Sequence, residues 1–356
     1  MDQINKEGLS LEESLENDPE VAMQETDFVK YEIISELGIS AWENFYHARR
    51  EGADKDPTHP GVALVTLNRK KYIEKFKRLI EKEGKWEDDD DIPKMAEKEF
   101  DKINQEFGRR YKGVMDIALH PCLPKVCLVE QDRINKLCFA ELEYVSGAPF
   151  LNTVLSPFQI LGLAKNLLEG LEHMHDHGLL HRRIKSENIY IHFEGSKPVV
   201  KFTSWGIAVP IDKAQGDRSG SKHYVAPEVL AKGKVNVQAD LWAVGSLLYQ
   251  ALTGEYPFPE REEAQNLPQL LNCTKNEKMP NELKVYEHFR NLSQNEAKEL
   301  NVDKLQELVS ELLKPDPEQR AFKTARKVIA FIELNWPKVM WGAPDTKEML
   351  TFTTSR

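Results

Sequence analysis

Residues 181–208 read HRRIKSENIYIHFEGSKPVVKFTSWGIA, and this stretch decides the fold. Four of its first eight residues stand at the spacing of a catalytic loop: His181, Arg182, Lys185 and Asn188. The third residue is Arg183, at a place where acid–base chemistry would need an acid. An arginine stays protonated at physiological pH and cannot accept a proton. The stretch therefore has the framework of a reactive loop without the group that would react.

The composition places this stretch in a globular chain. The 356 residues are 40% hydrophobic and 30% charged, which is enough for one bilobal domain or two ordinary domains. No apolar run approaches the ~18 residues needed to span a bilayer, so we expect no membrane span. The acidic N-terminus lacks the apolar core of a secretory signal. A net charge of −10 disfavours a nucleic-acid-binding face. We therefore expect a cytoplasmic protein that binds no nucleic acid.

The four cysteines lack the C-x-x-C spacing of a metal site. We expect free, buried thiols in a reducing compartment: Cys122, Cys127, Cys138 and Cys273.

Strand patterns occupy the first part of the chain and helix patterns the second. Residues 31–48 predict a strand, a turn around one glycine and a second strand, and PGVALVTLN predicts a third strand. Residues 69–121 have helical propensity, broken near Gly84 and the acidic run 88–91 and restarted after Pro93. Residues 125–145 predict two further strands around EQDRINK. Helical spacing then recurs at 156–178, 237–253, 296–313 and 322–335.

Five motifs, in order and at matching separations, resemble the eukaryotic-type protein kinase family. They are the hinge-like ELEYVSG, the loop HRRIKSEN, SWG followed by GSKHYVAPE, the segment DLWAVGSLLYQALTGEYPF, and LLKPDPEQRA. The resemblance covers roughly residues 31–340. It implies an α+β, bilobal protein-kinase-like fold, with a small β-rich N-lobe and a larger helical C-lobe.

The resemblance also implies domain boundaries. We expect an acidic flexible tail at residues 1–27 and a kinase-like domain at 28–340, followed by a C-terminal tail at 341–356. The domain would divide into an N-lobe of about 28–145, with a charged insertion at about 68–100, and a C-lobe of about 146–340. The insertion is either a solvated helix and loop or a partner-docking arm with Trp86 as aromatic anchor. Trp336 and Trp341, near the C-terminus, are expected to dock onto the helical lobe.

Several residues match structural positions of the family. Glu228 and Arg320 would form a buried ion pair, because burying either charge alone is costly. Asp240 would cap the backbone of the catalytic loop. Trp205 would fill the apolar slot at His181.

The nucleotide-binding pattern of the family is matched in part. The glycine-rich lid aligns with GISAWE, where only Gly38 matches. Glu43 replaces the last glycine, and its carboxylate either lies where phosphate charge would sit or points into solvent. The residues left for a nucleotide cleft are Gly38, Ala63, Glu143, Val145, Lys185 and Asn188.

The residues that would do chemistry are replaced. Val65 stands at the strand lysine, Arg183 at the catalytic aspartate and Ser204 at the metal-binding aspartate, so we expect no catalytic residues and no metal ligands. The helix glutamate would fall near Tyr111, where no acid stands. Asn188 would hold a second magnesium in an active kinase, or else shapes the loop by hydrogen bonding. Arg183 is either a latch to an acid such as Asp217 or, with Lys185, a cationic floor for an anion.

This pattern favours a pseudokinase that acts as a protein-binding scaffold or allosteric regulator without conventional phosphotransfer. Its partners would be proteins, such as an active kinase or another signalling protein. We expect no cofactor, while ATP bound without metal stays open. The alternative is an atypical ATP-using transferase, protein-kinase-like or nucleotidyl-transferring, with a non-standard active site.

Overall fold

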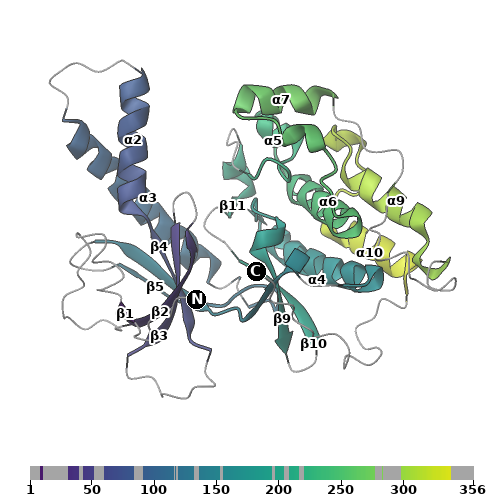
Figure 1. The fold of residues 1–356 in the computed structure, drawn as a ribbon, viewed down its shortest axis with the longest axis horizontal. Coiled ribbons are helices and arrows are strands. Elements are labelled where there is room, and N and C mark those ends of the chain that lie inside the picture. Colours follow the sequence, from purple (N-terminus) through teal and green to yellow (C-terminus); the bar gives the residue numbers. More distant parts are fainter. Residues whose placement is uncertain are drawn as a thin grey trace, which may run out of the picture. The chain divides into compact units, whose positions relative to one another are not determined.

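The computed structural model describes fourteen stretches of the chain. They are residues 9–10, 31–39, 43–51, 60–83, 91–115, 117, 119–131, 136–152, 155–194, 197–203, 208–215, 220–276, 283 and 298–337. The chain forms two compact units. The first comprises residues 1–119 and 124–146, and the second comprises residues 120–123 and 147–356 (Figure 1).

The first unit contains a six-stranded antiparallel sheet in the order β1-β2-β3-β4-β6-β5. Its strands are β1 (Leu9–Ser10), β2 (Tyr31–Ile39), β3 (Glu43–Arg50), β4 (Val62–Leu67), β5 (Val126–Gln131) and β6 (Cys138–Glu143). The strands expected within 31–48, 60–68 and 125–145 are confirmed. Strand β1 pairs with β2, so Leu9 and Ser10 of the expected flexible tail extend the sheet.

One face of this sheet forms a hydrophobic core, because side chains alternate between the two faces of a strand. Its buried members are Tyr31, Ile33, Tyr46, Ala48, Leu64 and Phe139. Beside them the buried carboxylate of Glu141 accepts hydrogen bonds from the Tyr31 hydroxyl at 2.6 Å and from two Arg50 nitrogens at 2.7 Å each. This carboxylate joins β2, β3 and β6 through charge-assisted hydrogen bonds.

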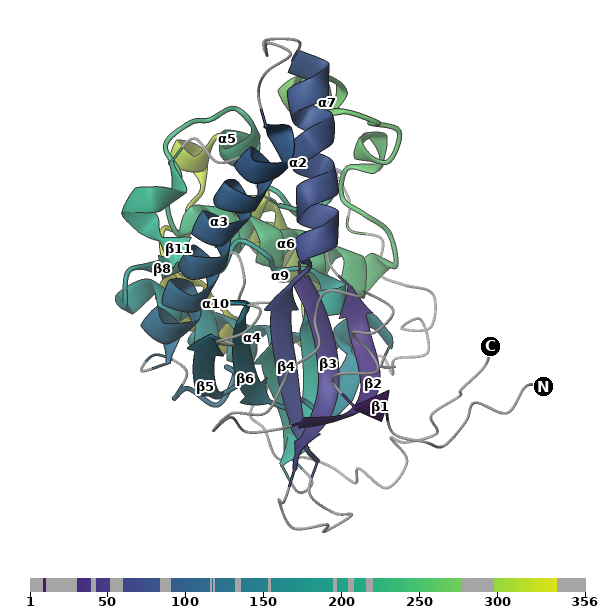
Figure 2. The same cartoon turned by 90° about the vertical axis from the view of Figure 1, so that its left-hand side faces the viewer.

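Two helices complete the first unit: α2 (Arg69–Glu83) and α3 (Ile92–Val114). The restart was predicted after Pro93 but α3 begins at Ile92, and the break predicted near Gly84 lies outside the described residues. Asp91 caps α3 by accepting the Lys94 backbone N–H, and Pro93 is tolerated because it lies in the first turn. Helix α2 lies against α3, with the Tyr72 and Phe100 rings 5.7 Å apart (Figure 2). Helix α3 in turn packs on β5 and β6.

The second unit is mainly helical. Its α-helices are α4 (Pro157–Asp176), α5 (Pro227–Leu230), α6 (Gln238–Thr253), α7 (Leu267–Asn276), α9 (Val302–Leu312) and α10 (Ala325–Asn335). Its short 3-10 helices are η1 (Phe150–Asn152), η2 (Ser186–Asn188), η4 (Ile211–Ala214), η5 (Pro259–Arg261) and η7 (Pro317–Gln319). Strands β7 (Gly147–Pro149), β9 (Ile189–Glu194) and β10 (Lys197–Phe202) form one small sheet, and β8 (Leu179–Leu180) pairs with β11 (Val209–Pro210).

Local sequence explains where the main helices begin and end. Ser156 and Gln159 form a reciprocal capping box at the start of α4, whose first residue is Pro157. Helix α6 ends at Gly254, whose φ of 78° is a left-handed conformation that favours glycine. Helix α6 is buried along most of its length and packs on α4 and α9. It is therefore the helix that positions the loops around it.

Trp336 docks onto the second unit as expected. It is 3% exposed, and its indole N–H donates to the Leu300 carbonyl at 2.6 Å. Trp86, Trp205, Ser204, Asp217 and Trp341 lie outside the described residues.

All four cysteines are free, as predicted. Burial was predicted for all four but is found for Cys122 and Cys138 alone, whereas Cys127 and Cys273 are half-buried. Within the described stretches, no cluster of His, Cys, Asp and Glu side chains could hold a metal ion. No helix among them is long and apolar enough to cross a membrane.

Candidate functional site

Asp240, in the first turn of α6, holds the catalytic-loop backbone. Its carboxylate accepts the backbone N–H groups of His181 at 2.9 Å and Arg182 at 2.8 Å, and lies 3.0 Å from the His175 ring nitrogen. Burial by itself would raise the pKa of Asp240, but the hydrogen bonds with the His175 ring and the Arg182 backbone N–H help to outweigh burial and lower it. The predicted capping role of Asp240 is confirmed.

His181 is a neutral, structural histidine. Burial lowers its pKa to about 4, so the ring carries no proton charge at neutral pH. Its Nδ1 accepts the backbone N–H of Arg183 at 3.2 Å, and its ring lies 5.0 Å from the ring of Phe202. The ring thus binds the loop backbone from the protein interior and offers no base to a substrate.

The other side of the loop is fixed by Asn188. Its side-chain amide donates to the Arg183 carbonyl at 2.9 Å, and its own carbonyl accepts the Thr203 backbone N–H at 2.8 Å. Arg182 has a φ of 65°, a left-handed conformation that is uncommon for a residue with a side chain. The loop is therefore held through main-chain atoms at residues 181, 182 and 183. This geometry favours the loop-shaping interpretation of Asn188.

Lys185 and its neighbours connect the loop to a later segment. The Lys185 ammonium lies 3.3 Å from a Glu187 carboxylate oxygen, and the Ser186 hydroxyl donates to the other oxygen at 2.8 Å. The Ser186 hydroxyl also lies 3.2 Å from the Tyr224 hydroxyl, which donates to Gln250 on α6. The catalytic loop, the GSKHYVAPE segment and α6 are thus joined by one polar chain.

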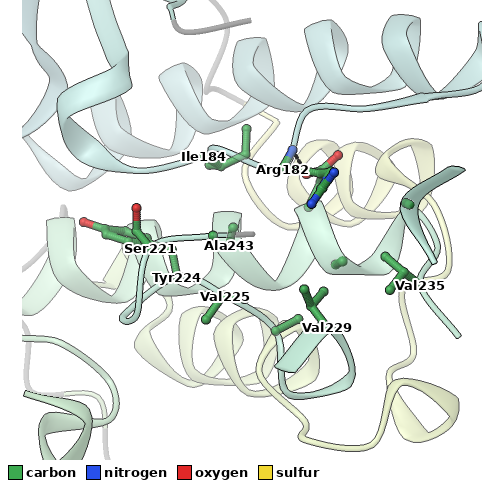
Figure 3. A pocket seen from close by; sticks show the side chains of 13 residues that line it. Arg182, Ile184, Ser221, Tyr224, Val225, Val229, Val235 and Ala243 are labelled. Atoms are coloured by element: carbon green, nitrogen blue, oxygen red, sulfur yellow. Dashed lines mark hydrogen bonds between the residues drawn. The ribbon is translucent and has the colours of Figure 1, made fainter. Parts of the chain in front are cut away.

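A pocket lies between the catalytic loop and residues 220–226. Figure 3 shows Arg182 and Ile184 on one side of it, and Val225, Val229 and Val235 on the other. Its lining is mostly apolar, with the Arg182 side chain as its basic group.

The buried ion pair expected from the motifs is present. Two guanidinium nitrogens of Arg320 each lie 2.8 Å from one oxygen of the Glu228 carboxylate. Arg320 also donates to the carbonyls of Lys314 at 2.8 Å and Gln238 at 3.1 Å. Both charges are therefore paired and hydrogen-bonded, which is the condition for burying them.

A further residue, missed by the sequence reasoning, holds the same segment. Arg261 is fully buried, and its guanidinium donates to the carbonyls of Lys222 at 2.8 Å and Val225 at 2.7 Å. Nearby, a ring nitrogen of His223 lies 2.6 Å from the Glu262 carboxylate. The available signal for Arg261 was its position as a charged residue shortly after EYPF. Its carbonyl partners lie about 40 residues away in the sequence, so this signal did not indicate what it binds.

In the first unit, the position that the resemblance assigns to the strand lysine lies inside the protein. Val65 is 0% exposed and stands opposite Phe45 of β3 and Ala140 of β6. Glu43 is 4% exposed and lies two residues before Phe45, on the same face of the sheet. The interpretation that Glu43 points into solvent is therefore wrong. Strand pairing places its carboxylate on the face that carries Val65.

The remaining first-unit candidates lie along β2, β4 and β6. Gly38 faces Phe45 across the β2–β3 pair, and Ala63 faces Leu142 on β6. The Glu143 backbone N–H donates to the Lys125 carbonyl at 2.8 Å, so this donor is already occupied. Val145 follows, half-buried, after the end of β6.

Helix α3 has no acid among its buried residues. All of α3 is described, and its buried residues are Ala96, Phe100, Asn104, Phe107, Gly108, Tyr111 and Val114. Asn104 uses its amide to accept the Cys138 N–H at 2.8 Å and to donate to the Lys136 carbonyl at 2.6 Å. A glutamate that would pair with a strand lysine is absent from this face.

Comparison with known proteins agrees with this architecture. A sequence model of the protein kinase domain matches residues 123–330, more than half of the chain. The chain belongs to the eukaryotic protein kinase family. The α+β kinase fold predicted from the five motifs is thereby confirmed, with its β-sheet N-terminal part and helical C-terminal part.

Several curated kinases are similar to part of this chain. The serine/threonine-protein kinase shk1/pak1 of Schizosaccharomyces pombe is 33% identical over 124 residues, which are 33% of this chain and 18% of that protein. The serine/threonine-protein kinase SMU1 of Mycosarcoma maydis is 31% identical over 124 residues, 33% of this chain and 16% of that protein. Human Nek5, also named a serine/threonine-protein kinase, is 29% identical over 217 residues, 58% of this chain and 28% of that protein. The chain thus spans less than a third of the length of each of these relatives.

Proposed function

We propose that this chain is a pseudokinase: a protein kinase-fold protein that acts as a protein-binding scaffold or allosteric regulator without transferring phosphoryl groups. The observation that carries the proposal is Arg183. It stands at the catalytic position of a loop whose backbone is otherwise held as a catalytic loop, by Asp240 on one side and Asn188 on the other.

The residue at the catalytic position of the loop cannot take a proton from a substrate hydroxyl. Phosphoryl transfer to a hydroxyl uses an acceptor that orients the hydroxyl and takes its proton. General-base catalysis contributes roughly 10² to 10⁴-fold in rate. Arg183 donates hydrogen bonds and cannot accept a proton, and the nearby His181 ring is buried and already accepts a backbone N–H. Neither side chain is a base for a substrate.

The first unit is poorly suited to neutralise the charge of nucleotide phosphates. In an active kinase a strand lysine and metal ions neutralise the nucleotide phosphates. Here Val65 offers an apolar side chain with no access to solvent, and Glu43 adds a buried carboxylate to the same face of the sheet. Helix α3 supplies no acid to pair with a lysine. The described residues therefore do not fit a magnesium–nucleotide complex, and Ser204 in the sequence replaces the carboxylate that magnesium prefers.

The second unit keeps the contacts that fix its loops. The ion pair of Glu228 with Arg320, the carbonyl contacts of Arg261 and the caps of Asp240 keep the second unit's loops in a defined shape. A defined surface without chemistry suits binding to another protein. We propose that the partner is an active kinase or another signalling protein.

Radiolabelled ATP tests the proposal directly. The purified chain is incubated with Mg²⁺ or Mn²⁺ and generic protein substrates, beside Arg183→Ala and an active kinase. We expect no incorporation above the Arg183→Ala background with either metal. Metal-dependent incorporation by the wild-type chain that exceeds this background would contradict the proposal.

A second candidate, an ATP-using transferase with a non-standard site, is favoured by one observation. The similar proteins are named serine/threonine-protein kinases, and the framework of the second unit matches their family. Thermal unfolding with ATP, with and without Mg²⁺, separates the two. A stabilisation of several degrees that requires metal supports the transferase. A metal-independent shift supports ATP as a structural ligand, and no shift supports the binding protein alone.

The role of the charged insertion is best tested by surface substitution. Deleting residues 68–100 would remove Ala96 and Phe100, which are buried against the rest of the first unit. Reversing the exposed charges of Lys70, Lys71 and Arg78 on α2 keeps that packing intact. If α2 is a docking arm, the charge-reversed chain loses a partner that the wild-type chain binds; retained binding would leave α2 as a solvated helix.

A further inference from the structure

Three histidine rings form a row in the second unit. The His120 and His173 ring centroids are 5.1 Å apart, and those of His173 and His177 are 4.6 Å apart. His173 and His177 lie one turn apart at the end of α4 and just beyond it, whereas His120 belongs to the short segment 120–123. That segment is the part of the chain between α3 and β5 that clusters with the second unit.

The protonation pattern of this row is set by its hydrogen bonds. Nδ1 of His120 lies 3.2 Å from the Cys122 backbone N–H and accepts from it, so this nitrogen carries no proton. Nδ1 of His177 lies 2.7 Å from the His173 carbonyl and must donate to it. A proton added to His120 would enter at Nδ1, where it would face another donor.

The Nδ1 bond of His120 is one of several that fasten segment 120–123. The Cys122 carbonyl accepts the Phe202 N–H of β10 at 2.8 Å, and the Cys122 thiol donates to the Asn166 carbonyl of α4 at 3.2 Å. Leu123 closes the turn by donating its N–H to the His120 carbonyl at 2.9 Å. Losing the His120 cap therefore loosens a turn that joins α4 and β10.

The surroundings of His120 disfavour its protonated form. Burial lowers its pKa, and the neighbouring His173 and the 5%-exposed Lys201 of β10 act in the same direction. Glu169 of α4 acts oppositely. Its carboxylate already accepts the Asn166 side-chain amide at 3.0 Å and lies 3.6 Å from the Lys165 ammonium. Lys165 also pairs with Glu333 of α10 at 2.8 Å.

We propose that the His120–His173–His177 row is a pH-sensitive latch that holds segment 120–123 on α4 and β10 at neutral pH and releases it on mild acidification. Protonation of His120 turns its Nδ1 from an acceptor into a donor, so the bond from the Cys122 N–H is lost. It also places a second positive charge beside Lys201, and both changes favour release. The latch is independent of whether the chain transfers phosphoryl groups.

The size of the effect follows from linkage. In the released state His120 titrates as an ordinary histidine, with a pKa of about 6.5. If only the released state takes up the proton, acidification from pH 7.5 to 5.5 raises the opening equilibrium about tenfold. Amide exchange reports such local opening when closing is faster than exchange.

Hydrogen–deuterium exchange on the full chain tests the latch. Protection of a peptide spanning residues 119–126 is compared at pH 7.5 and 5.5, after correction for the intrinsic exchange rate. The wild-type chain should lose up to about tenfold of its protection at pH 5.5. His120→Asn keeps an acceptor oxygen near the Nδ1 position and has no proton to gain, so it should show no such loss. His47→Gln, a change to a stacked histidine in the first unit, is the matched control and should behave as wild type.

Two outcomes overturn the proposal: equal wild-type protection at both pH values, or the same pH-dependent loss in His120→Asn. If His120→Asn is already unprotected at pH 7.5, His120→Asp decides. Its carboxylate can accept the Cys122 N–H and stays ionised between pH 7.5 and 5.5, so the cap is kept at both pH values. A loss clearly smaller than that of wild type supports the latch, and an unchanged loss refutes it.

Discussion

Replacing Glu228 by Gln tests whether the buried ion pair sustains the fold. The change keeps the size of the side chain and removes its charge. Arg320 would remain, with its side chain 1% exposed, facing a neutral amide at the two positions where carboxylate oxygens now lie 2.8 Å away. Breaking a buried pair by removing one partner costs about 3–5 kcal/mol, because the other charge is left uncompensated. That is a large part of the roughly 5–15 kcal/mol by which domains are stable.

Urea unfolding followed by circular dichroism measures this cost. The matched control is Glu307→Gln, because the Glu307 carboxylate lies 2.6 Å from the Lys304 ammonium with both side chains exposed by 40% or more. An exposed pair of that kind contributes at most about 1 kcal/mol. The double variant Glu228→Gln with Arg320→Met should recover part of the loss, since it no longer buries an unpaired charge. Equal costs for Glu228→Gln and Glu307→Gln would refute the reasoning.

Two further predictions concern pH and packing. His181 has a pKa of about 4 in the folded protein and about 6.5 when unfolded, so its contribution to stability is present above pH 6.5 and is lost as the pH falls toward 4. Urea unfolding between pH 7 and 4.5 should show a loss of about 2 kcal/mol, and a flat profile would contradict the assigned burial. Gly170→Ala would place a Cβ 2.5 Å from the Phe202 ring and 2.9 Å from the Cys122 Cβ, so overpacking should cost about 1–3 kcal/mol in thermal unfolding, whereas unchanged stability would show that α4 can shift freely.

In the second unit, the sequence predicted a contact wherever both of its residues stand in recognised motifs. Glu228 and Arg320 are 92 residues apart, yet both were recognised because each stands in its own matching segment. Asp240 and the loop at 181–182 were recognised in the same way. Arg261 was not recognised, because it binds main-chain carbonyls. Every residue has such a carbonyl, so the sequence does not indicate which ones bind a side chain.

The first unit was harder to predict because its motifs are altered. The burial of Glu43 depends on its register opposite Leu67, which puts it on the face of Phe45 and Val65. A strand pattern alone does not choose between the two faces, and a one-residue slip would have placed the carboxylate on the face of the Tyr46 and Leu64 core. The pairing of Leu9–Ser10 with β2 was missed because two residues carry too little periodicity to indicate a strand.

The structure gives a physical reason why the loop tolerates Arg183. The contacts that shape the loop at this point use the Arg183 backbone: its N–H donates to His181 Nδ1 and its carbonyl accepts from the Asn188 amide. Neither bond depends on the side chain, so position 183 can carry an arginine in place of an acid without disturbing the backbone. Glu228 differs, because its side chain is itself the counter-charge of Arg320. Loss of a chemical group at position 183 therefore costs little stability, while loss at position 228 costs much. Under the proposed function, a chain that no longer catalyses phosphoryl transfer would accept substitutions at positions such as 183 and would retain residues such as Glu228.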